Sequence, residues 1–434
     1  MEENQSNPIE YTFGLLGEKL SHSYSPQIHE KLGSSPYKLI EIDRENVQAF
    51  IEKHPFRGIN VTIPYKRIAA ETAQVLSYDA ERLGNANTLI VQNDGTLYAD
   101  NTDYYGFKCM VNQSGIDIHG KTCLILGDGA AAQTVKTVLM DLGAGLMVAA
   151  SRHGKITFDH FDKNSEVAQS LKHEVAVIVN ATPVGMYPHA NDSLLIDLGE
   201  FTNLELVLDL IYNPLRTRII QEASRLGIPA YGGLYMLVAQ AKRASDLFLS
   251  VTRSDSIIDI IYSELLHELE TVSIIGMPGN GKTTVGKRLA KLLNKTFVDV
   301  DVLIEQKTGL TIPQIFESQG EEGFRKLEEQ YTYEACSGPC RVVSCGGGVV
   351  TREANYANLH MNGRIVLLER GLGERPHTLS SKGRPVSQKL GIEKIRETRE
   401  PLYRAWADLT IDSGKGSRDN AKKLTSILQE GDVL

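Results

Sequence analysis

Two glycine-rich segments of the chain have residue types and spacing that suit phosphate binding. Residues 127–132, Gly-Asp-Gly-Ala-Ala-Ala, follow an apolar run at 122–126 and open a helical stretch. Small residues in such a turn let the backbone approach a pyrophosphate, while the helix N-terminus supplies N–H donors. Residues 276–283, Gly-Met-Pro-Gly-Asn-Gly-Lys-Thr, follow a second apolar run and form a complete phosphate-binding loop. The chain is therefore expected to bind a nicotinamide cofactor and a nucleoside triphosphate, which suggests two consecutive reactions.

The residues after the next strand indicate which dinucleotide binds at the first turn. An NAD site normally has an acidic residue here, which holds the ribose 2′-hydroxyl. This chain instead has Ser151, Arg152 and Lys155. Two cations suit a 2′-phosphate, so NADP(H) is favoured, and the alternative is a solvated basic loop.

In the second loop, a lysine and a hydroxyl set the chemistry. Lys282 is expected to reach the terminal phosphates and Thr283 to ligate Mg²⁺, with ATP as the nucleotide. The other predicted nucleotide contacts are Gly279, Asn280, Gly281 and Thr284. Downstream, Asp299 and Asp301 stand at the end of an apolar strand. If the strand continues, the two side chains lie on opposite faces and have different roles.

Three series of short apolar runs, alternating with helical patterns, position these motifs. The first fills about the first hundred residues, the second begins near Lys121 and the third near Val272. Strands alternating with helices indicate α/β layers with parallel sheets. We predict an α/β substrate domain at 1–104, completed by helices at about 236–270. We predict next a Rossmann-type NADP-binding domain at 105–235. The last predicted domain, at 272–434, is an α/β/α domain that contains the phosphate-binding loop and a central parallel sheet.

The composition narrows the class of protein. A hydrophobic content of 41% and a charged content of 23% are typical of soluble globular proteins. The net charge of −8 argues against nucleic acid or anionic lipid as a partner, and no apolar run is long enough to span a membrane. A metal site built from Cys336, Cys340 and Cys345 would lack a fourth ligand, so we expect reduced thiols in a cytoplasmic protein. We expect no obligate protein partner.

Hydroxyl, amide and ionisable groups gather at the predicted strand ends of the first series, where they suit a polyol substrate. The segments are Ser-Tyr-Ser-Pro at 23–26, Asn-Val-Thr-Ile-Pro-Tyr-Lys at 60–66, Gly-Asn-Ala-Asn-Thr at 84–88 and Asp-Asn-Thr-Asp at 100–103. Further segments are Asn-Ala-Thr-Pro-Val-Gly-Met at 180–186, Ile-Tyr-Asn-Pro at 211–214 and Gly-Leu-Tyr-Met-Leu-Val-Ala-Gln at 233–240. With these motifs, residues 11–249 resemble shikimate dehydrogenase.

That resemblance implies that Lys66 and Asp103 form the catalytic pair beside the carbonyl carbon that receives a hydride. A ketone reduced by hydride needs a proton for its developing alkoxide, and a lysine held by an aspartate can donate it. The resemblance assigns substrate contacts to Ser23, Ser25, Thr62, Asn87, Tyr212 and Gln240. It assigns cofactor contacts to Gly127, Asp128, Gly129, Ala130, Ala131 and Gly233.

The third series carries its own set of motifs after the phosphate loop. They are Gly-Glu-Glu-Gly-Phe-Arg at 320–325, three glycines at 346–348, Gly-Arg-Pro at 383–385 and Arg-Glu-Pro-Leu-Tyr at 399–403. Residues 272 to about 429 thereby resemble shikimate kinase. The resemblance implies that Asp301 orients and deprotonates the accepting hydroxyl, that Asp299 lies near Mg²⁺, and that Arg384 belongs to a lid over ATP. It assigns the shikimate contacts to Arg325, Gly346, Gly347, Gly348 and Arg399.

The two resemblances support each other, because reduction of 3-dehydroshikimate creates the hydroxyl that the kinase phosphorylates. We therefore expect a bifunctional enzyme that uses NADP(H), ATP and Mg²⁺ to make shikimate and then shikimate 3-phosphate. One alternative is a metabolite sensor built from the same domains, although the retained catalytic groups argue against it. Another is a quinate-preferring dehydrogenase joined to a kinase of a different small alcohol.

Overall fold

The computed structural model describes residues 11–20, 23–162, 166–369, 392–412, 414 and 416–430 of the 434-residue chain. It forms two compact units. Unit 1 contains the chain up to Val184, together with Leu194–Tyr212 and Glu222–Tyr262, and unit 2 contains Gly185–Ser193, Asn213–Gln221 and the chain from Ser263. Within the described ranges, no helix combines the length and apolar character needed to cross a membrane.

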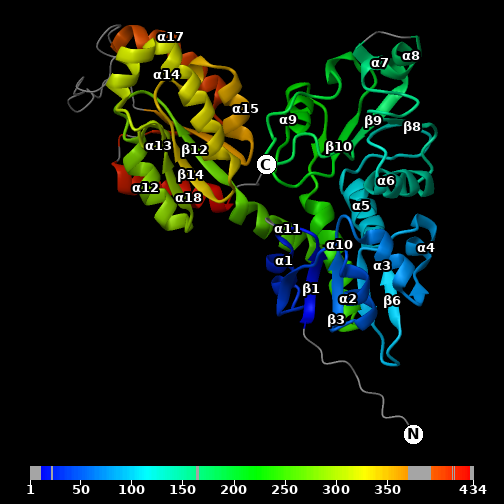
Figure 1. Cartoon of the computed structure of the whole chain (residues 1–434). Coiled ribbons are helices and arrows are strands. Elements are labelled where there is room, and N and C mark those ends of the chain that lie inside the picture. The colour runs from blue at the N-terminus through cyan, green and yellow to red at the C-terminus, as the bar shows by residue number, and fades with distance from the viewer. Residues whose placement is uncertain are drawn as a thin grey trace. The chain divides into compact units, whose positions relative to one another are not determined.

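Unit 1 begins with a six-stranded sheet in the order β2-β1-β3-β5-β6-β4 (Figure 1). Its strands are β1 (Tyr11–Gly17), β2 (Tyr37–Glu41), β3 (Phe56–Val61), β4 (Val75–Leu76), β5 (Thr88–Val91) and β6 (Leu97–Asp100). The prediction of a parallel sheet was wrong for this region, because β5 pairs antiparallel with both β3 and β6. The short segment between β5 and β6 contains Gly95 at a φ of 85°, so it reverses the chain as a hairpin instead of crossing over through a helix.

The hairpin determines which residues meet at the edge of this sheet. Because β5 runs against β3, the residues just before β5 lie at the edge where β1 and β3 end, and β6 ends there as well. This arrangement brings Asn87, before β5, and Asp103, after β6, to the loops that carry Ser23 and Lys66. The mixed sheet therefore gathers residues from four separate segments.

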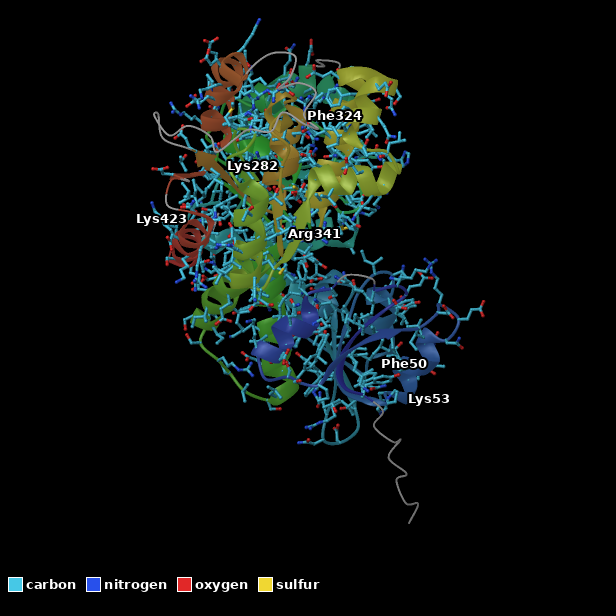
Figure 2. All side chains as sticks on the ribbon, turned by 90° about the vertical axis from the view of Figure 1, so that its left-hand side faces the viewer. Phe50, Lys53, Lys282, Phe324, Arg341 and Lys423 are labelled. Carbon is cyan, nitrogen blue, oxygen red and sulfur yellow. The ribbon has the colours of Figure 1, made fainter. Side chains whose placement is uncertain are left out.

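Helices complete unit 1. They are α1 (Ser25–Lys31), α2 (Val47–Lys53), α3 (Lys66–Thr72), α4 (Tyr78–Leu83), α5 (Thr102–Gln113), α6 (Ala130–Asp141), α7 (Asp159–Asp162), α8 (Glu166–Glu174) and α10 (Leu234–Leu249). Helix α9 (Arg218–Arg225) and helix α11 (Ser256–Leu269) each have residues in both units. Figure 2 shows the side chains of both units, with Phe50 and Lys53 on α2 in unit 1 and Lys282 and Phe324 in unit 2.

Helices α5 and α10 pack against each other at close range. A Cβ on Gly106 of α5 would lie 2.8 Å from the carbonyl oxygen of Met236 and 3.0 Å from the Cβ of Gln240. Glycine at this position therefore lets the two backbones approach, and it brings Gln240 beside the first turn of α5. That first turn carries Asp103.

The second sheet of unit 1 has five parallel strands in the order β11-β10-β9-β7-β8. They are β7 (Thr122–Leu126), β8 (Met147–Ala150), β9 (Val175–Asn180), β10 (Leu206–Asp209) and β11 (Ala230–Tyr231). The chain runs from β7 to one side at β8 and to the other side at β9, so the strand order reverses there. In a parallel α/β sheet this reversal opens a crevice at the carboxyl ends of the strands, and the turn at Gly127 lies at that edge.

Unit 2 has a five-stranded, fully parallel sheet in the order β13-β14-β12-β15-β16, as predicted. Its strands are β12 (Thr271–Ile275), β13 (Thr296–Asp299), β14 (Arg341–Ser344), β15 (Gly363–Glu369) and β16 (Leu409–Asp412). Its helices are α12 (Lys282–Leu293), α13 (Val300–Thr308), α14 (Ile312–Ser337), α15 (Ala354–His360), α17 (Ile392–Trp406) and α18 (Ser417–Glu430). The predicted α/β fold class is confirmed in both units.

Alternating side chains of the central strand fill two separate cores in unit 2. Ile274 packs with Leu289 of α12 and Leu424 of α18 on one face of the sheet. The next residue, Ile275, packs with Phe324 of α14 on the other face. A parallel sheet covered by helices on both faces is buried on both, which explains why every residue of β12 is buried, including Thr271 and Ser273.

Candidate active sites

The first candidate site is a cavity of about 270 Å³ in unit 1. Lys66 is the first residue of α3 and its Nζ lies 2.5 Å from Oδ2 of Asp103, with both side chains mostly buried. Ten of the predicted site residues line this cavity: Ser23, Ser25, Thr62, Lys66, Asn87, Asp103, Ala131, Tyr212, Gly233 and Gln240. The arrangement places a cation–carboxylate pair among hydroxyl and amide groups, as a polyol ketone would require.

Asn87 connects this pair to the opposite wall of the cavity. Its Nδ2 lies 2.9 Å from Oδ1 of Asp103 and 2.9 Å from Oε1 of Gln240. Asp103 therefore receives hydrogen bonds on both carboxylate oxygens, one from Asn87 and one from Lys66. Donors on both oxygens orient the carboxyl group, and a carboxyl group oriented in this way holds the lysine side chain in place.

Among the residues of this cavity that the sequence analysis did not assign to the site are the polar residues His29 and Asn60. His29 stacks on Tyr37 at 4.0 Å between ring centroids, and burial lowers its pKa to about 3, so the imidazole is neutral. Asn60 is buried at the end of β3 and accepts a hydrogen bond from the Tyr37 hydroxyl at 2.8 Å. The signal for Asn60 was in the sequence, because it immediately precedes Val61 and Thr62 in a motif that was recognised.

The predicted cofactor residues other than Ala131 and Gly233 lie outside this cavity, along the edge of the second sheet. Gly127 has a φ of 116°, and a Cβ on it would lie 3.1 Å from the carbonyl oxygen of Ala181. Gly129 is the N-cap of α6, and a Cβ on it would meet nothing within 4 Å. The start of α6 therefore follows a turn in which the conformation of Gly127 favours glycine and the space beside Gly129 is open, which is suitable for a pyrophosphate. Asp128 and Ala130 are exposed in this turn.

The loop after β8 carries the residues predicted for the 2′-phosphate. Arg152 and Lys155 are exposed, and Ser151 is buried with its Oγ lacking a hydrogen-bond partner in the structure. The backbone N–H of Ser151 donates to the carbonyl of Ile156 at 3.0 Å, which closes the loop into a tight turn. An unsatisfied hydroxyl flanked by two cations fits a phosphate, so the residues present suit NADP(H).

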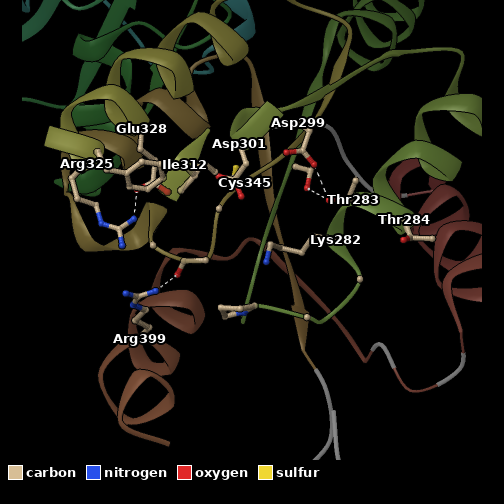
Figure 3. A pocket seen from close by; sticks show the side chains of 18 of the residues that line it. Lys282, Thr283, Thr284, Asp299, Asp301, Ile312, Arg325, Glu328, Cys345 and Arg399 are labelled. Carbon is tan, nitrogen blue, oxygen red and sulfur yellow. Dashed lines mark hydrogen bonds and ion pairs between the residues drawn. The ribbon is translucent and has the colours of Figure 1, made fainter. Parts of the chain in front are cut away.

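The second candidate site is a cavity of about 400 Å³ in unit 2 (Figure 3). Twelve predicted residues line it: Gly279, Gly281, Lys282, Thr283, Thr284, Asp299, Asp301, Arg325, Gly346, Gly347, Gly348 and Arg399. Asn280 lies beside it, with its Nδ2 donating to the carbonyl of Leu368 at 2.8 Å. Arg384 lies outside the described residues.

The glycines of the phosphate loop have conformations and spacing that other residues would not tolerate. Gly276, Gly279 and Gly281 all have positive φ, and a Cβ on Gly276 would lie 2.5 Å from the carbonyl oxygen of Leu368. Lys282 begins α12, and its Nζ donates to the carbonyls of Gly276 and Met277 at 2.9 and 3.1 Å. The ammonium is thus held over the loop, next to the N–H groups that open the helix, where phosphate oxygens bind.

Two oxygen groups stand together at the end of β13. The Thr283 hydroxyl donates to Oδ2 of Asp299 at 2.7 Å. Strand β13 ends at Asp299 and α13 begins at Val300, so the strand does not continue to Asp301. Asp299 is the N-cap of α13, and Asp301 lies in its first turn. The two carboxylates therefore differ in direction because a helix begins between them, and the Thr283–Asp299 oxygens suit Mg²⁺.

Asp301 is surrounded by other acidic groups. Burial raises its pKa to about 7, and the negative charges of Glu328 and Asp299 add to this effect. A Cβ on Gly346 would lie 2.9 Å from Oδ1 of Asp301 and 2.7 Å from Oε1 of Glu328, so both carboxyl groups face this glycine. A carboxylate with a pKa near neutrality can take a proton from an alcohol more readily than an ordinary aspartate.

Arg325 and Arg399 occupy the opposite part of the cavity. Nη1 of Arg325 lies 2.6 Å from Oε2 of Glu328, and Nη1 of Arg399 donates to the carbonyl of Gly347 at 2.9 Å (Figure 3). Sequence reasoning missed Glu328, although a carboxylate three residues after an arginine on a helix is a common pairing signal. The two guanidinium groups supply the positive charge that a substrate carboxylate needs.

The chain contains five cysteines, two in unit 1 and three in unit 2. All five are free of disulfides, and no cluster of three or more His, Cys, Asp or Glu side chains is present among the described residues. Cys345 lines the second cavity, and burial raises the pKa of its thiol well above the usual range. Cys345 is therefore a buried thiol in the wall of the second cavity.

Comparisons with known proteins match both parts of the chain to families. The model of the shikimate dehydrogenase substrate-binding domain matches residues 15–89, and the shikimate kinase model matches residues 278–429. The shikimate dehydrogenase (NADP(+)) of Clostridium beijerinckii is 34% identical over 271 residues, which is 59% of this chain and 99% of that protein.

Solved structures show the same relationship for the first part of the chain. Shikimate dehydrogenase 1 from Peptoclostridium difficile is 35% identical with a TM-score of 0.51, and the match covers 59% of this chain and 97% of that one. The shikimate 5-dehydrogenase from Thermus thermophilus in complex with NADP(H) and shikimate is 28% identical with a TM-score of 0.51, covering 58% and 99%. The chain therefore belongs to the shikimate dehydrogenase family and is a fusion of such a dehydrogenase with a shikimate kinase.

Proposed function

We propose that unit 1 reduces 3-dehydroshikimate with NADPH, and that unit 2 transfers a phosphoryl group from Mg-ATP to the 3-hydroxyl of the shikimate formed. The observation that carries this proposal is that each unit contains its own cavity, lined by residues predicted for its reaction. In unit 1 these residues include the Lys66–Asp103 pair, and in unit 2 they include Lys282 and Asp301.

In the reduction, NADPH supplies a hydride when bound, and the protein supplies the proton and the orientation. The Lys66 ammonium, held by Asp103, donates a proton to the oxygen of the ketone as the carbon accepts the hydride. Ser23, Ser25, Thr62, Asn87, Tyr212 and Gln240 hold the carboxylate and hydroxyls of the substrate. Gly127, Gly129 and the start of α6 hold the pyrophosphate, while Arg152, Lys155 and Ser151 hold the 2′-phosphate.

In the phosphorylation, Mg-ATP supplies the phosphoryl group when bound. Asp301 orients the 3-hydroxyl and takes its proton, while Arg325 and Arg399 hold the substrate carboxylate. Lys282 stabilises the charge on the phosphates, and Thr283 with Asp299 holds the Mg²⁺. Arg384 is assigned to the lid by resemblance alone.

Product analysis tests both activities at once. We would incubate the protein with 3-dehydroshikimate and NADPH, with and without Mg-ATP, and identify the products by mass spectrometry. Shikimate without ATP and shikimate 3-phosphate with ATP are the expected products. Binding of the cofactors and substrate without either product would instead favour the sensor alternative, and faster turnover of quinate than of shikimate would favour the other enzyme alternative.

Single substitutions separate the two sites. Lys66→Ala should abolish reduction but leave phosphorylation of added shikimate intact, and Lys282→Ala should do the reverse. Arg67→Ala, at an exposed neighbour paired with Glu71, and Lys291→Ala, at an exposed position of α12, serve as matched controls. A folded variant of Lys66 or Lys282 that has lost both activities would contradict the two-site proposal.

A further inference from the structure

The hydrogen bonds behind Asp103 form a single directed series. The Tyr37 hydroxyl donates to Oδ1 of Asn60 at 2.8 Å, and Nδ2 of Asn60 donates to the Thr88 hydroxyl at 3.0 Å. The Thr88 hydroxyl donates to Oδ1 of Asn87 at 3.2 Å, and Nδ2 of Asn87 donates to Asp103 at 2.9 Å. Each bond points its hydrogen toward the carboxylate, and hydrogen bonds aligned in this way strengthen one another.

Thr88 is the member of this series that lies deepest in the protein. It is the first residue of β5, it is fully buried, and it pairs with Asn60 of β3 and Asp100 of β6. It does not line the cavity, so it has no route to the substrate except through its neighbours. Any effect of the Thr88 side-chain hydrogen bonds on the reaction must therefore pass through Asn87, Asn60 or Thr102, whose hydroxyl lies 3.3 Å from that of Thr88.

The carboxamide of Asn87 has one orientation that satisfies its surroundings. Its Oδ1 receives hydrogen bonds from the backbone N–H of Thr102 at 2.7 Å, the Thr102 hydroxyl at 3.1 Å and the Thr88 hydroxyl at 3.2 Å. A flipped amide would turn its NH₂ group toward these three groups and its oxygen toward the carboxylate of Asp103. The backbone N–H of Thr102, which can only donate, fixes this orientation, and the two hydroxyls add to the hold on the same oxygen, so that Asn87 donates to Asp103 and Gln240.

We propose that Thr88 is a positioning residue of the reduction. Its hydroxyl holds the Asn87 carboxamide toward Asp103, and Asn60 holds the hydroxyl itself. Thr88→Val keeps the branched shape but removes the hydrogen bonds of this hydroxyl to Asn60, Asn87 and Thr102. It leaves Nδ2 of Asn60 with the Asn87 carbonyl at 3.4 Å. The inference rests on the proposed roles of Lys66 and Asp103 in the reduction.

Steady-state kinetics of Thr88→Val and Thr88→Ser test this role. Thr88→Val should lower the kcat for reduction of the dehydroshikimate substrate by roughly tenfold, because a buried polar group loses its partner. The KM for NADPH and the phosphorylation of added shikimate should stay unchanged. Thr88→Ser keeps the hydroxyl and should restore most of the kcat. If Thr88→Val does not fold, Thr88→Ala, whose smaller side chain fits the same space, replaces it in the comparison.

The outcomes distinguish positioning from a purely structural role. Wild-type kcat in Thr88→Val would overturn the inference, as would equal losses in Thr88→Val and Thr88→Ser. A loss of kcat that accompanies a lower unfolding temperature and a raised KM for NADPH would also overturn it, in favour of general destabilisation. Wild-type protein that does not reduce 3-dehydroshikimate would refute the proposed function itself, which separates the two failures.

Discussion

We predict that shikimate binding in unit 2 requires glycine at position 348, because the guanidinium of Arg325 lies against this residue. Its backbone has a φ of −103° and a ψ of −3°, which any residue can adopt, so alanine introduces no backbone strain. A Cβ at this position, however, would lie 1.9 Å from Nη1 of Arg325 and 2.2 Å from its Cζ. Gly348→Ala therefore forces the guanidinium of Arg325 to move.

The guanidinium of Arg325 has little freedom to move. Its Nη1 lies 2.6 Å from Oε2 of Glu328, whose side chain is 1% exposed, and its Nη2 lies 3.3 Å from Glu321. Displacement of the guanidinium breaks its buried, charge-assisted hydrogen bond to Glu328, or removes the hydrogen bond that Arg325 is proposed to donate to the shikimate carboxylate. Losing such a bond costs about 1.5–3 kcal/mol, which corresponds to roughly a 10- to 150-fold loss in kcat/KM.

The assay is the rate of shikimate phosphorylation as a function of shikimate concentration. Gly348→Ala should raise the KM for shikimate, with the reduction catalysed by unit 1 unchanged as the internal control. An Arg325→Ala background provides the second control, because Gly348→Ala should add little once the guanidinium is absent. Wild-type kinetics in Gly348→Ala, or full additivity in the double variant, would refute the reasoning.

Three further predictions concern the binding of NADPH by Arg152, the pH dependence set by Asp301 and the stability that the Glu270–Arg364 ion pair gives to unit 2. Arg152→Ala should raise the KM for NADPH far more than that for NADH, since only NADPH has the 2′-phosphate; equal effects would remove this contact. Phosphorylation should lose about tenfold in kcat/KM per pH unit below about 7, because the pKa of Asp301 is raised to about 7 and only the ionised form accepts a proton. A flat acidic profile would contradict the role of Asp301 as the base. Glu270→Ala removes the carboxylate partner of the buried Arg364 and should destabilise unit 2 by about 3 kcal/mol in urea unfolding. Glu270→Ala/Arg364→Met should recover part of this loss, and an unchanged unfolding midpoint in Glu270→Ala would refute the expectation.

The glycine and hydroxyl motifs could be recognised from the sequence because their chemistry depends on neighbours in the chain. The loop that ends at Lys282 and Thr283 follows its strand directly, so a local pattern was enough to predict where it lies. Lys66 and Asp103, which end two polar segments, were also predicted to form a pair. The structure places Nζ of Lys66 2.5 Å from Oδ2 of Asp103. Local patterns and a family resemblance together identified most of the residues that line both cavities.

The sequence could not show contacts that depend on tertiary packing. The antiparallel hairpin of β5 and β6 was missed because its apolar runs have the same length as those of parallel strands. Glu328 was missed because a glutamate on a helix is usually exposed, and only the packing of α14 buries it beside Asp301. Asn60 and Thr88 were parts of known motifs, but their hydrogen-bond partners come from other strands.

The aspartates of the two sites have contrasting environments, which suit the opposite tasks proposed for them. Asp103 faces donors, because Lys66 and Asn87 each donate to one of its oxygens, and it is therefore suited to anchor a cation. Asp301 faces two other carboxylates, which together with burial raise its pKa to about 7, and it is therefore suited to receive a proton. In the reduction the proton must come from the protein, and in the phosphorylation it must go to the protein. The contrasting environments of Asp103 and Asp301 match this difference between making the hydroxyl and activating it.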